Sequence, residues 1–425
     1  MFGSLIFLLW ILLLILSFIK TRDLFSPGKV FSAIFFVFFG DIFFTPYSEK
    51  VYLSILLIFF IHLILILSEK KINFTLPKSF ILNRSYKKIV RRIWLLTTIP
   101  ILAQLLLINK LGGLEKYILS IGLRVDAWKG LGYLIFFTKF INMLNYLYFI
   151  VILKLKNKTK NIKIIFFLHF LVFTVISLMS GSRSTLLWNL VFMMVYYNYN
   201  IKKVNFTLIL SGALIIVILA MIIGVARDGY KYTDDGIQTG LQGSSKILKM
   251  SNFTYGLDPL ELVLNNNLKE IKYGSTYVSA VTNLIPRKLW PGKPDTGGMV
   301  ITKDYLNNVY GGFSYISPGL IPEAIINFGY FVGFIFSFII MNLFNFSLLR
   351  FRRKQYTFRK NLKKEVLIKG IYPFLLFGVI SYIYAEFTTN TISMMIFKVF
   401  TFYLIVVLCL PKKEENSLKL LDEIR

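Results

Sequence analysis

Charged side chains stand at the ends of several apolar stretches of the sequence, and some of them could do chemistry. Arg183 in "SGSRST" and Arg227 in "GVARDGY" each adjoin an apolar run, and Arg124 lies in "GLRVDAWKG". A guanidinium group is planar, always charged and able to donate two parallel hydrogen bonds, which suits phosphate and diphosphate oxygens. Ionisable residues in or beside membrane spans are costly and mark candidate functional sites. The three arginines predict an anion site for a lipid-linked phosphate head group.

Three carboxylates accompany these arginines at the ends of other apolar runs. Glu323 directly follows Pro322 in "SPGLIPEAIINFGYFVG", in the first turn of an expected helix, where the helix dipole stabilises a negative charge. Its position fits a helix-start residue equally well as a base or a substrate-binding group. Asp41 and Glu386 fit either substrate binding or ion pairing with the arginines. For each charge, simple extension to the membrane interface remains the alternative.

Histidine and cysteine are too sparse to build a further site from the sequence. His62 lies inside "FFIHLILIL" and His169 lies near a basic connection, so we expect both to be packed or hydrogen-bonded within a helical bundle. Cys409 is the only cysteine and lies in an apolar run, which predicts a small buried core residue. Two separated histidines without carboxylates at ligand spacing predict neither a metal site nor a cofactor.

The composition is that of a membrane protein. Of the 425 residues, 56% are hydrophobic and only 16% are charged, and the mean hydropathy is +0.65. The net charge of +28 follows from 49 Lys and Arg against 21 Asp and Glu. Most of these cations occur in short runs between apolar stretches, which is typical of cytoplasmic loops and argues against a nucleic-acid partner.

The apolar runs predict an all-α polytopic protein with about eleven spans, because a span needs roughly 20 residues to cross about 30 Å of hydrocarbon. The chain is expected to form one transmembrane domain over 1–425. The first run has neither a basic region nor a small-residue cleavage site, so we interpret it as a retained span. The expected spans are 3–19, 29–47, 51–68, 93–109, 131–153, 163–181, 184–199, 206–226, 320–349, 370–386 and 390–410.

The distribution of Lys and Arg predicts which side of the membrane each connection occupies. Basic residues concentrate in 68–92, 154–163, 202–203 and 350–365, which all fall on one side and are therefore expected to be cytoplasmic. The N-terminus then faces outward, and the tail 411–425 faces the cytoplasm. Asp41, Arg183, Arg227, Glu323 and Glu386 all come to the outer level.

A large loop over 227–319 between the eighth and ninth spans is expected outside the membrane. It carries ten Lys and Arg against eight Asp and Glu, so it lacks the basic excess of the cytoplasmic connections. A loop of this length is usually functional. Its first half has helical periodicity around 257–271.

The second half of this loop contains "LIPRKLWPGKPDTGG", whose prolines disfavour a helix. Trp290 beside Arg287, Lys288 and Lys293 offers a face for sugar stacking with cations nearby. A rigid turn in which Trp290 anchors at the membrane interface is the alternative. The segment is interpreted as part of a lid over an outward-facing site.

Taken together, "SGSRST", "GVARDGY", "IPRKLWPGKP" and "PEAIINFGYFVG" resemble the oligosaccharide repeat unit polymerases, the Wzy-type O-antigen and capsule polymerases of bacterial envelopes. The resemblance is strongest from about 180 to 335. It implies a glycosyltransferase of the GT-C type in the cytoplasmic (inner) membrane. Its donor and acceptor would be undecaprenyl-diphosphate-linked oligosaccharides, and it would need no metal or nucleotide.

The resemblance also implies roles for individual residues. Arg183 and Arg227 would hold the diphosphate and stabilise the charge that develops on it, and Glu323 would help to deprotonate the acceptor hydroxyl. Arg287 and Lys293 match the family pattern, and Arg124 matches it more loosely. Membrane lipids, a chain-length regulator and a flippase are the further partners that this function implies.

Two other functions remain open from the sequence. An O-antigen ligase, which passes a finished glycan to another acceptor, is expected to use an external histidine, and neither histidine is expected outside. A flippase or transporter of lipid-linked oligosaccharides is expected to carry charges at the membrane midplane and inverted repeats. Here the charges considered gather at the outer edge.

Overall fold

The structure, a computed structural model, describes most of the chain and resolves it into two compact units. The described residues are 2–71, 83–121, 127–128, 130–155, 157–180, 183–207, 211–212, 230–233, 236–239, 254–266, 270–283, 285, 287–306, 316–357 and 361–411. Unit 1 comprises 1–73, 249–353 and 374–396, and unit 2 comprises 74–248, 354–373 and 397–425. The single domain expected over 1–425 thus contains two units, each described separately below.

Unit 1 begins with a group of three helices that pack on one another. These are α1 (Phe2–Lys20), α2 (Pro27–Phe39) and α3 (Glu49–Ser68), with the 3₁₀-helix η1 (Gly40–Phe43) following α2. Pro27 suits the first turn of α2 because it has no backbone N–H to leave unpaired there. The expected span 29–47 therefore consists of a 13-residue helix and a 3₁₀ turn.

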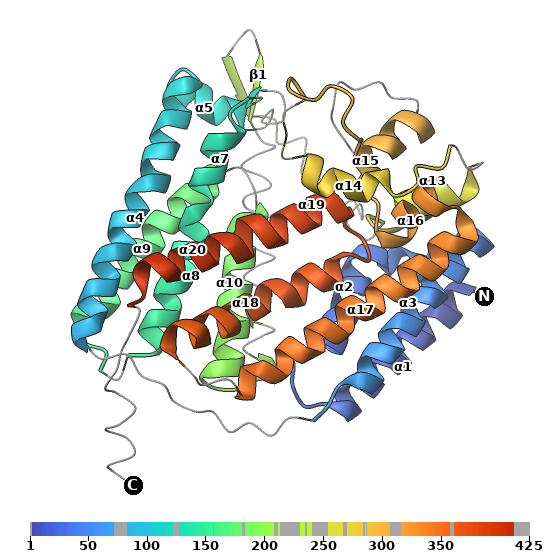
Figure 1. Ribbon diagram of the computed structural model, residues 1–425, viewed down its shortest axis with the longest axis horizontal. Coiled ribbons are helices and arrows are strands. Elements are labelled where there is room, and N and C mark those ends of the chain that lie inside the picture. The colour runs from blue at the N-terminus through green and yellow to red at the C-terminus, as the bar shows by residue number, and fades with distance from the viewer. Residues whose placement is uncertain are drawn as a thin grey trace. The chain divides into compact units, whose positions relative to one another are not determined.

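The middle of the chain adds short helices to unit 1. They are α13 (Leu257–Asn265), α14 (Ser275–Thr282), α15 (Gly297–Val300), the π-helical η4 (Ile301–Tyr305) and α16 (Leu320–Phe328). The helix expected around 257–271 is confirmed in α13. α13 packs on α3, α16 and η4, and α14 packs on α16 and α19 (Phe387–Thr391) (Figure 1).

A glycine divides the expected ninth span into two helices. α16 ends at Phe328, and α17 (Tyr330–Thr357) begins immediately after Gly329. Gly329 has a φ of 78°, in the region that glycine tolerates best, so the chain can turn here. A Cβ on Gly333 would lie 2.8 Å from the backbone nitrogen of Ile325, so the absence of a side chain allows α17 to pack against α16. The "GYFVG" spacing thus combines a helix break with a close packing contact.

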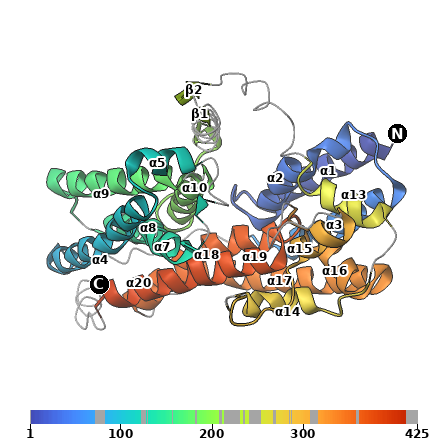
Figure 2. The same ribbon diagram turned by 90° about the horizontal axis from the view of Figure 1, so that it is seen from above.

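Unit 2 is built from four longer helices and three short ones. The longer helices are α4 (Asn83–Lys110), α8 (Phe140–Leu153), α9 (Lys160–Met179) and α10 (Arg183–Asn200), and the short ones are α5 (Leu114–Ser120), α7 (Gly132–Thr138) and α20 (Thr401–Cys409). α8 is central, because α4, α9, α10 and α20 all pack on it (Figures 1 and 2). A short antiparallel hairpin of β1 (Tyr230–Thr233) and β2 (Gly236–Thr239) accompanies them.

Two further helical stretches contribute to both units. α18 (Leu362–Ser381) contains Pro373, and the last stretch continues from α19 through the π-helical η5 (Ile392–Phe400) into α20.

Both histidines are packed and hydrogen-bonded, as predicted. His62 Nε2 donates to the Gly28 carbonyl oxygen at 2.8 Å and lies 3.3 Å from Ser32 Oγ. His169 Nε2 lies 3.0 Å from Thr97 Oγ1, and its Nδ1 lies 3.3 Å from Asn145 Oδ1. Cys409 is buried, as predicted.

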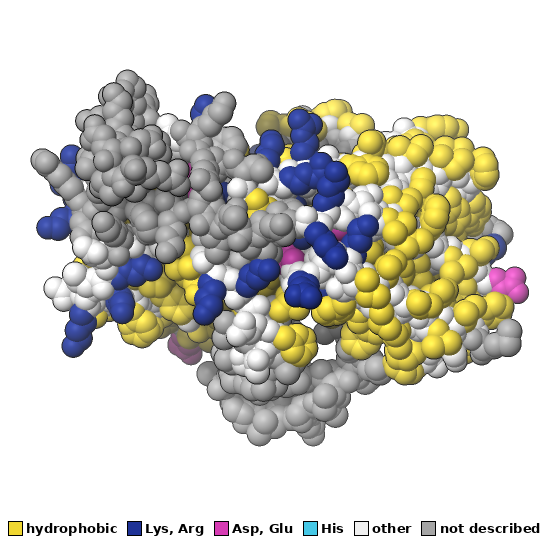
Figure 3. Space-filling model, turned by 90° about the horizontal axis from the view of Figure 1, so that it is seen from below, with side chains coloured by type: hydrophobic (Ala, Val, Ile, Leu, Met, Phe, Trp, Pro, Cys, Tyr) yellow, Lys and Arg dark blue, Asp and Glu magenta, His cyan; other side chains and the backbone are white. Residues whose placement is uncertain are grey.

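Seven helices in the described part of the chain are long and apolar enough to cross a membrane. Each overlaps one of the expected spans, although Tyr330–Tyr356 begins ten residues later than the expected 320–349. Broad areas of exposed apolar side chains appear on the face in Figure 3. The expected span 184–199 is helical in α10, and 370–386 is helical in α18 as far as Ser381, but both fall outside this set. The described part of the chain is therefore almost entirely helical, and its long apolar helices are those of a polytopic membrane protein. The seven are Phe2–Lys20, Glu49–Ser68, Ser85–Lys110, Gly132–Leu153, Lys160–Met179, Tyr330–Tyr356 and Phe387–Cys409.

Candidate functional site

Two of the predicted carboxylates come together in unit 1, although 63 positions separate them in the sequence. Glu323 lies in the first turn of α16, and Glu386 is the residue before α19. Glu323 is fully buried and Glu386 is 5% exposed. Each carboxylate contacts the short helix α15, which follows the proline-rich segment. The first turn of α16 and the start of α19 therefore meet at α15.

Glu386 receives hydrogen bonds from the N-terminus of α15 and from its own helix. Its Oε1 accepts from the backbone N–H of Gly298 at 2.7 Å, and its Oε2 accepts from the Thr389 hydroxyl. The backbone N–H of Glu386 donates to Ser317 Oγ at 2.8 Å. Glu386 thus links the start of α19 to α15 and to the segment before α16.

Glu323 has hydrogen-bond partners at both of its carboxylate oxygens. The Thr276 hydroxyl donates to Oε1 at 2.8 Å, and the backbone N–H of Phe387 donates to Oε2 at 2.9 Å. A Cβ on Gly297 would lie 2.9 Å from the Glu323 carboxyl carbon, so α15 passes directly against this group. Asn327 donates to the Thr276 oxygen at 2.6 Å and extends the network. In this arrangement Glu323 positions α14, α15 and α19 relative to α16.

The surroundings of Glu323 favour its neutral form. Burial and, to a smaller extent, the nearby Glu386 carboxylate together raise its pKa to about 8, although the hydrogen bonds from Phe387 and Thr276 act in the opposite direction. The folded protein then keeps this proton up to about pH 8, whereas an unfolded chain releases it near 4.5. The stability that accompanies the bound proton is complete at low pH and is lost as the pH rises between these values.

We therefore expect the Glu323→Gln variant to lose part of the pH dependence of stability. The thermal midpoint of the wild type minus that of the variant, measured in detergent, should decrease from pH 5 to pH 9. Only the wild type must then bury a charge or retain a proton at a cost in free energy. Glu49→Gln, at an exposed carboxylate, is the matched control. A difference that stays constant across this pH range would show that Glu323 does not titrate in this way.

Arg287 and Lys293, both predicted to bind substrate, are held by groups within their own loop. Arg287 forms an ion pair with Asp295 and donates to the carbonyl oxygen of Pro291 at 3.2 Å. Lys293 Nζ donates to the carbonyl oxygen of Ile285 at 2.7 Å and to Asn283 Oδ1 at 3.2 Å. These contacts close the proline-rich segment into a folded loop that leads into α15.

Trp290 joins this loop through its backbone, because its carbonyl oxygen accepts from the Lys293 N–H at 3.3 Å. Its side chain is 43% exposed, and that of the neighbouring Leu289 is 77% exposed. Both the stacking role and the interfacial anchor predicted for Trp290 need such exposure.

Asp41 lies apart from this loop in η1, where its Oδ2 accepts from the Tyr47 hydroxyl at 2.8 Å.

The structure leaves the predicted arginine site largely undescribed. Arg124 and Arg227 lie outside the described residues, and so does most of the expected span 206–226. Arg183 begins α10, but its side chain is not described. The diphosphate-binding role of these three residues stays a prediction.

Two lysines of unit 2 that were not among the predicted site residues lie within helices long enough to span a membrane. Lys139 stands between α7 and α8, and Lys398 lies in η5. The signal was present, because each is a single cation inside an apolar run, "FFTKFINML" and "SMMIFKVFTFYL". A single lysine does not lower the mean hydropathy of such a run enough to interrupt an expected span, so these two lysines were not considered as site residues.

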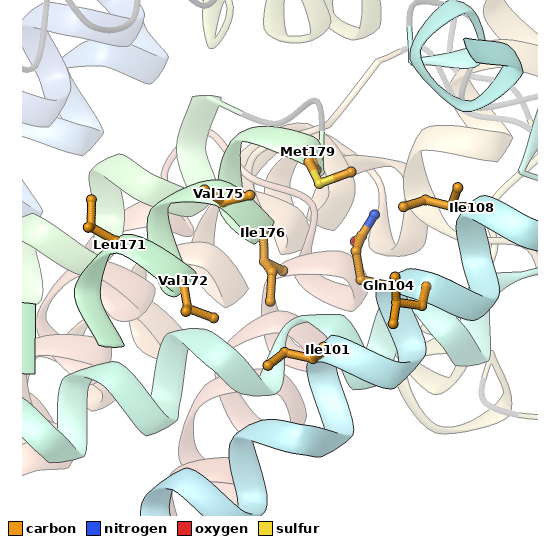
Figure 4. A pocket seen from close by; sticks show the side chains of 9 residues that line it. Ile101, Gln104, Ile108, Leu171, Val172, Val175, Ile176 and Met179 are labelled. Atoms are coloured by element: carbon orange, nitrogen blue, oxygen red, sulfur yellow. The ribbon is translucent and has the colours of Figure 1, made fainter. Parts of the chain in front are cut away.

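A pocket on unit 2 lies between α4 and α9 (Figure 4). Ile101 and Leu105 line it from α4, and Val172 and Val175 line it from α9. Gln104 is the polar residue of the lining and is 5% exposed. Such an apolar lining on two helices of spanning length suits a hydrocarbon chain.

Comparisons with protein-family models, with curated proteins and with solved structures found no match to this chain.

Proposed function

We propose that this protein polymerises oligosaccharide repeat units carried on undecaprenyl diphosphate, at the outer face of the cytoplasmic membrane. The observation that supports this most directly is the meeting of two motif segments in unit 1. Gly297 and Gly298, which follow "IPRKLWPGKP", contact Glu323 and Glu386 through the close approach and the hydrogen bond described above. Segments that carry the resemblance to Wzy-type polymerases thus form one connected element.

The reaction proposed is a glycosyl transfer between two lipid-linked substrates. The hydroxyl oxygen of the acceptor sugar forms a bond to the anomeric carbon of the donor, and the bond from that carbon to the diphosphate oxygen breaks. The hydroxyl proton passes to a base, and undecaprenyl diphosphate leaves with the bonding electron pair. Preorganised cations stabilise the charge that grows on the leaving diphosphate, which is the role proposed for Arg183 and Arg227.

The folded loop before α15 fits a part of the acceptor or donor glycan site. Arg287 and Lys293 are held by neighbouring oxygens, so their loop is preorganised, and Trp290 presents an exposed aromatic face. Sugar rings stack on such faces through their C–H groups. Glu323 as the base stays a prediction. Its carboxyl group is buried and keeps its proton up to about pH 8, so it must lose this proton and become accessible before it can accept one from a hydroxyl group.

Purified protein in lipid bilayers is expected to lengthen undecaprenyl-diphosphate-linked repeat units without added nucleotide. The energy comes from the donor's own glycosyl diphosphate bond, so the products should form a ladder of increasing repeat number on a gel. Heat-unfolded protein in the same bilayers is the control. If the substrate and the bilayer stay intact and no product longer than one repeat forms, the polymerase function is contradicted. Movement of the substrate across the bilayer without lengthening would favour a flippase.

A further inference from the structure

Two cations are placed deep within helices of spanning length in unit 2. Lys398 lies in the middle of Phe387–Cys409, with eleven residues on either side, and Lys139 lies in Gly132–Leu153. A charge at the centre of a membrane span is costly, and such residues face the interior of the bundle or a cavity and commonly mark functional pathways. From the centre of a span, a lysine side chain is poorly placed to reach either interface.

Each ammonium group contacts aromatic rings, one ring for Lys139 and two for Lys398. Lys398 Nζ lies 5.5 Å from the ring centroid of Phe192 and 6.0 Å from that of Trp188, both on α10. Lys139 Nζ lies 4.6 Å from the ring centroid of Phe397, the residue next to Lys398. Cation–π contacts of this kind compensate part of the desolvation of a cation. Among the described residues, Lys398 Nζ donates no hydrogen bond to an oxygen acceptor.

The two lysines are neighbours through Phe397, whose ring contacts Lys139 and which precedes Lys398 in the chain. Their positive charges repel one another. Within the described part of the chain, no carboxylate lies within ion-pair distance of Lys398 Nζ. By contrast, the buried Lys154 and Lys369 both pair with Glu365 in the same unit. Two neighbouring cations in a low-dielectric region favour the binding of an anion.

The backbone around Lys398 is also unusual. η5 has nine residues in π-helical conformation between the α-helical turns of α19 and α20. Wider turns of this kind change the direction in which side chains leave a helix and occur often at functional sites. Here the π-helical stretch carries both Phe397, which contacts Lys139, and Lys398, which contacts α10.

We infer that Lys139 and Lys398 form a site for the phosphate or diphosphate group of a membrane lipid. The occupant is identified by its chemistry: an anion with several oxygens can accept from both ammonium groups, and an attached hydrocarbon chain can lie among apolar helices. If the lipid is the polymerase donor, an identification that rests on the proposed function, these lysines bind its diphosphate group.

The test measures binding by the full-length protein in nanodiscs of neutral lipid. Undecaprenyl diphosphate is the main probe, undecaprenol lacks the charge, and inorganic diphosphate lacks the chain. We expect Lys398→Met to weaken undecaprenyl diphosphate binding by about tenfold to a hundredfold, the effect of losing one charge-assisted hydrogen bond. Lys139→Met should weaken it similarly, Lys398→Arg should retain most of the affinity, and undecaprenol binding should not change.

Lys163→Met, which removes an exposed cation of α9, is the matched control and should bind as the wild type does. Unchanged binding of undecaprenyl diphosphate in both methionine variants would overturn the site. Equal affinity for inorganic diphosphate would show that the lysines bind a free anion and not a lipid. Wild-type binding without polymer formation would contradict the polymerase function alone, and polymer formation with normal binding in both variants would contradict this site alone.

Discussion

Replacing Arg183 or Arg227 by alanine is expected to abolish long polymer, while single repeat units still reach the cell surface. The proposed role of both guanidinium groups is to stabilise the charge that develops on the departing diphosphate. Removing one preorganised donor to such a charge typically lowers the rate by about 10² to 10³ fold. The measurement is the ladder of glycan chain lengths on a gel, together with surface labelling of the single unit.

The matched control for these variants is Arg91→Ala, at an exposed position of α4 in the basic region 68–92. It removes the same side chain and should leave the ladder unchanged. Lysine at 183 or 227 is expected to restore only part of the activity, because an ammonium group lacks the bidentate geometry of guanidinium. Normal ladders in Arg183→Ala or in Arg227→Ala would remove that residue from the diphosphate site.

The second large effect concerns stability, and it is expected for Glu365→Ala in α18. Glu365 Oε1 accepts from Lys154 Nζ and from Lys369 Nζ, each at 2.9 Å, and the three side chains are buried. The substitution leaves two buried ammonium groups without this carboxylate, which is expected to cost about 3 to 5 kcal/mol of folding free energy. Unfolding in mixed micelles of increasing denaturing detergent measures the loss.

Two comparisons make this prediction specific. Glu115→Ala removes an exposed carboxylate in α5 and should change the stability little. The triple variant Glu365→Leu, Lys154→Met, Lys369→Met removes all three charges together and should recover most of the lost stability, since apolar residues often replace a buried ion network without penalty. A Glu365→Ala variant as stable as the wild type would mean that water or other groups already satisfy both lysines.

Hydropathy predicted the long helices well because length and apolar content decide whether a segment can span. α1, α3 and α9 lie within one or a few residues of the expected runs 3–19, 51–68 and 163–181. The expected number of eleven spans stays a prediction. The hairpin of β1 and β2 was not expected, because a four-residue strand has too little pattern to be distinguished in sequence from a polar loop.

The candidate site was predictable at the level of residues but only partly at the level of contacts. Glu323 and Glu386 were placed at one level from the alternation of spans, and the structure brings both to α15. That Asp295 neutralises Arg287 was not foreseen, because the fold of the loop decides which of several nearby acids a guanidinium group meets. Lys398 was missed because a hydropathy window averages one charge into its apolar neighbours.

The break at Gly329 has a consequence for how the chain enters the membrane during synthesis. The candidate span begins at Tyr330, so Glu323 belongs to a separate short helix and not to the segment that must partition into lipid. An acidic residue near the centre of an inserting helix costs about 2.5 to 3.5 kcal/mol, whereas Tyr330–Tyr356 carries its charges only in its last turns. A buried carboxyl group can thus be kept in the folded protein without weakening the signal by which the neighbouring helix is recognised and inserted.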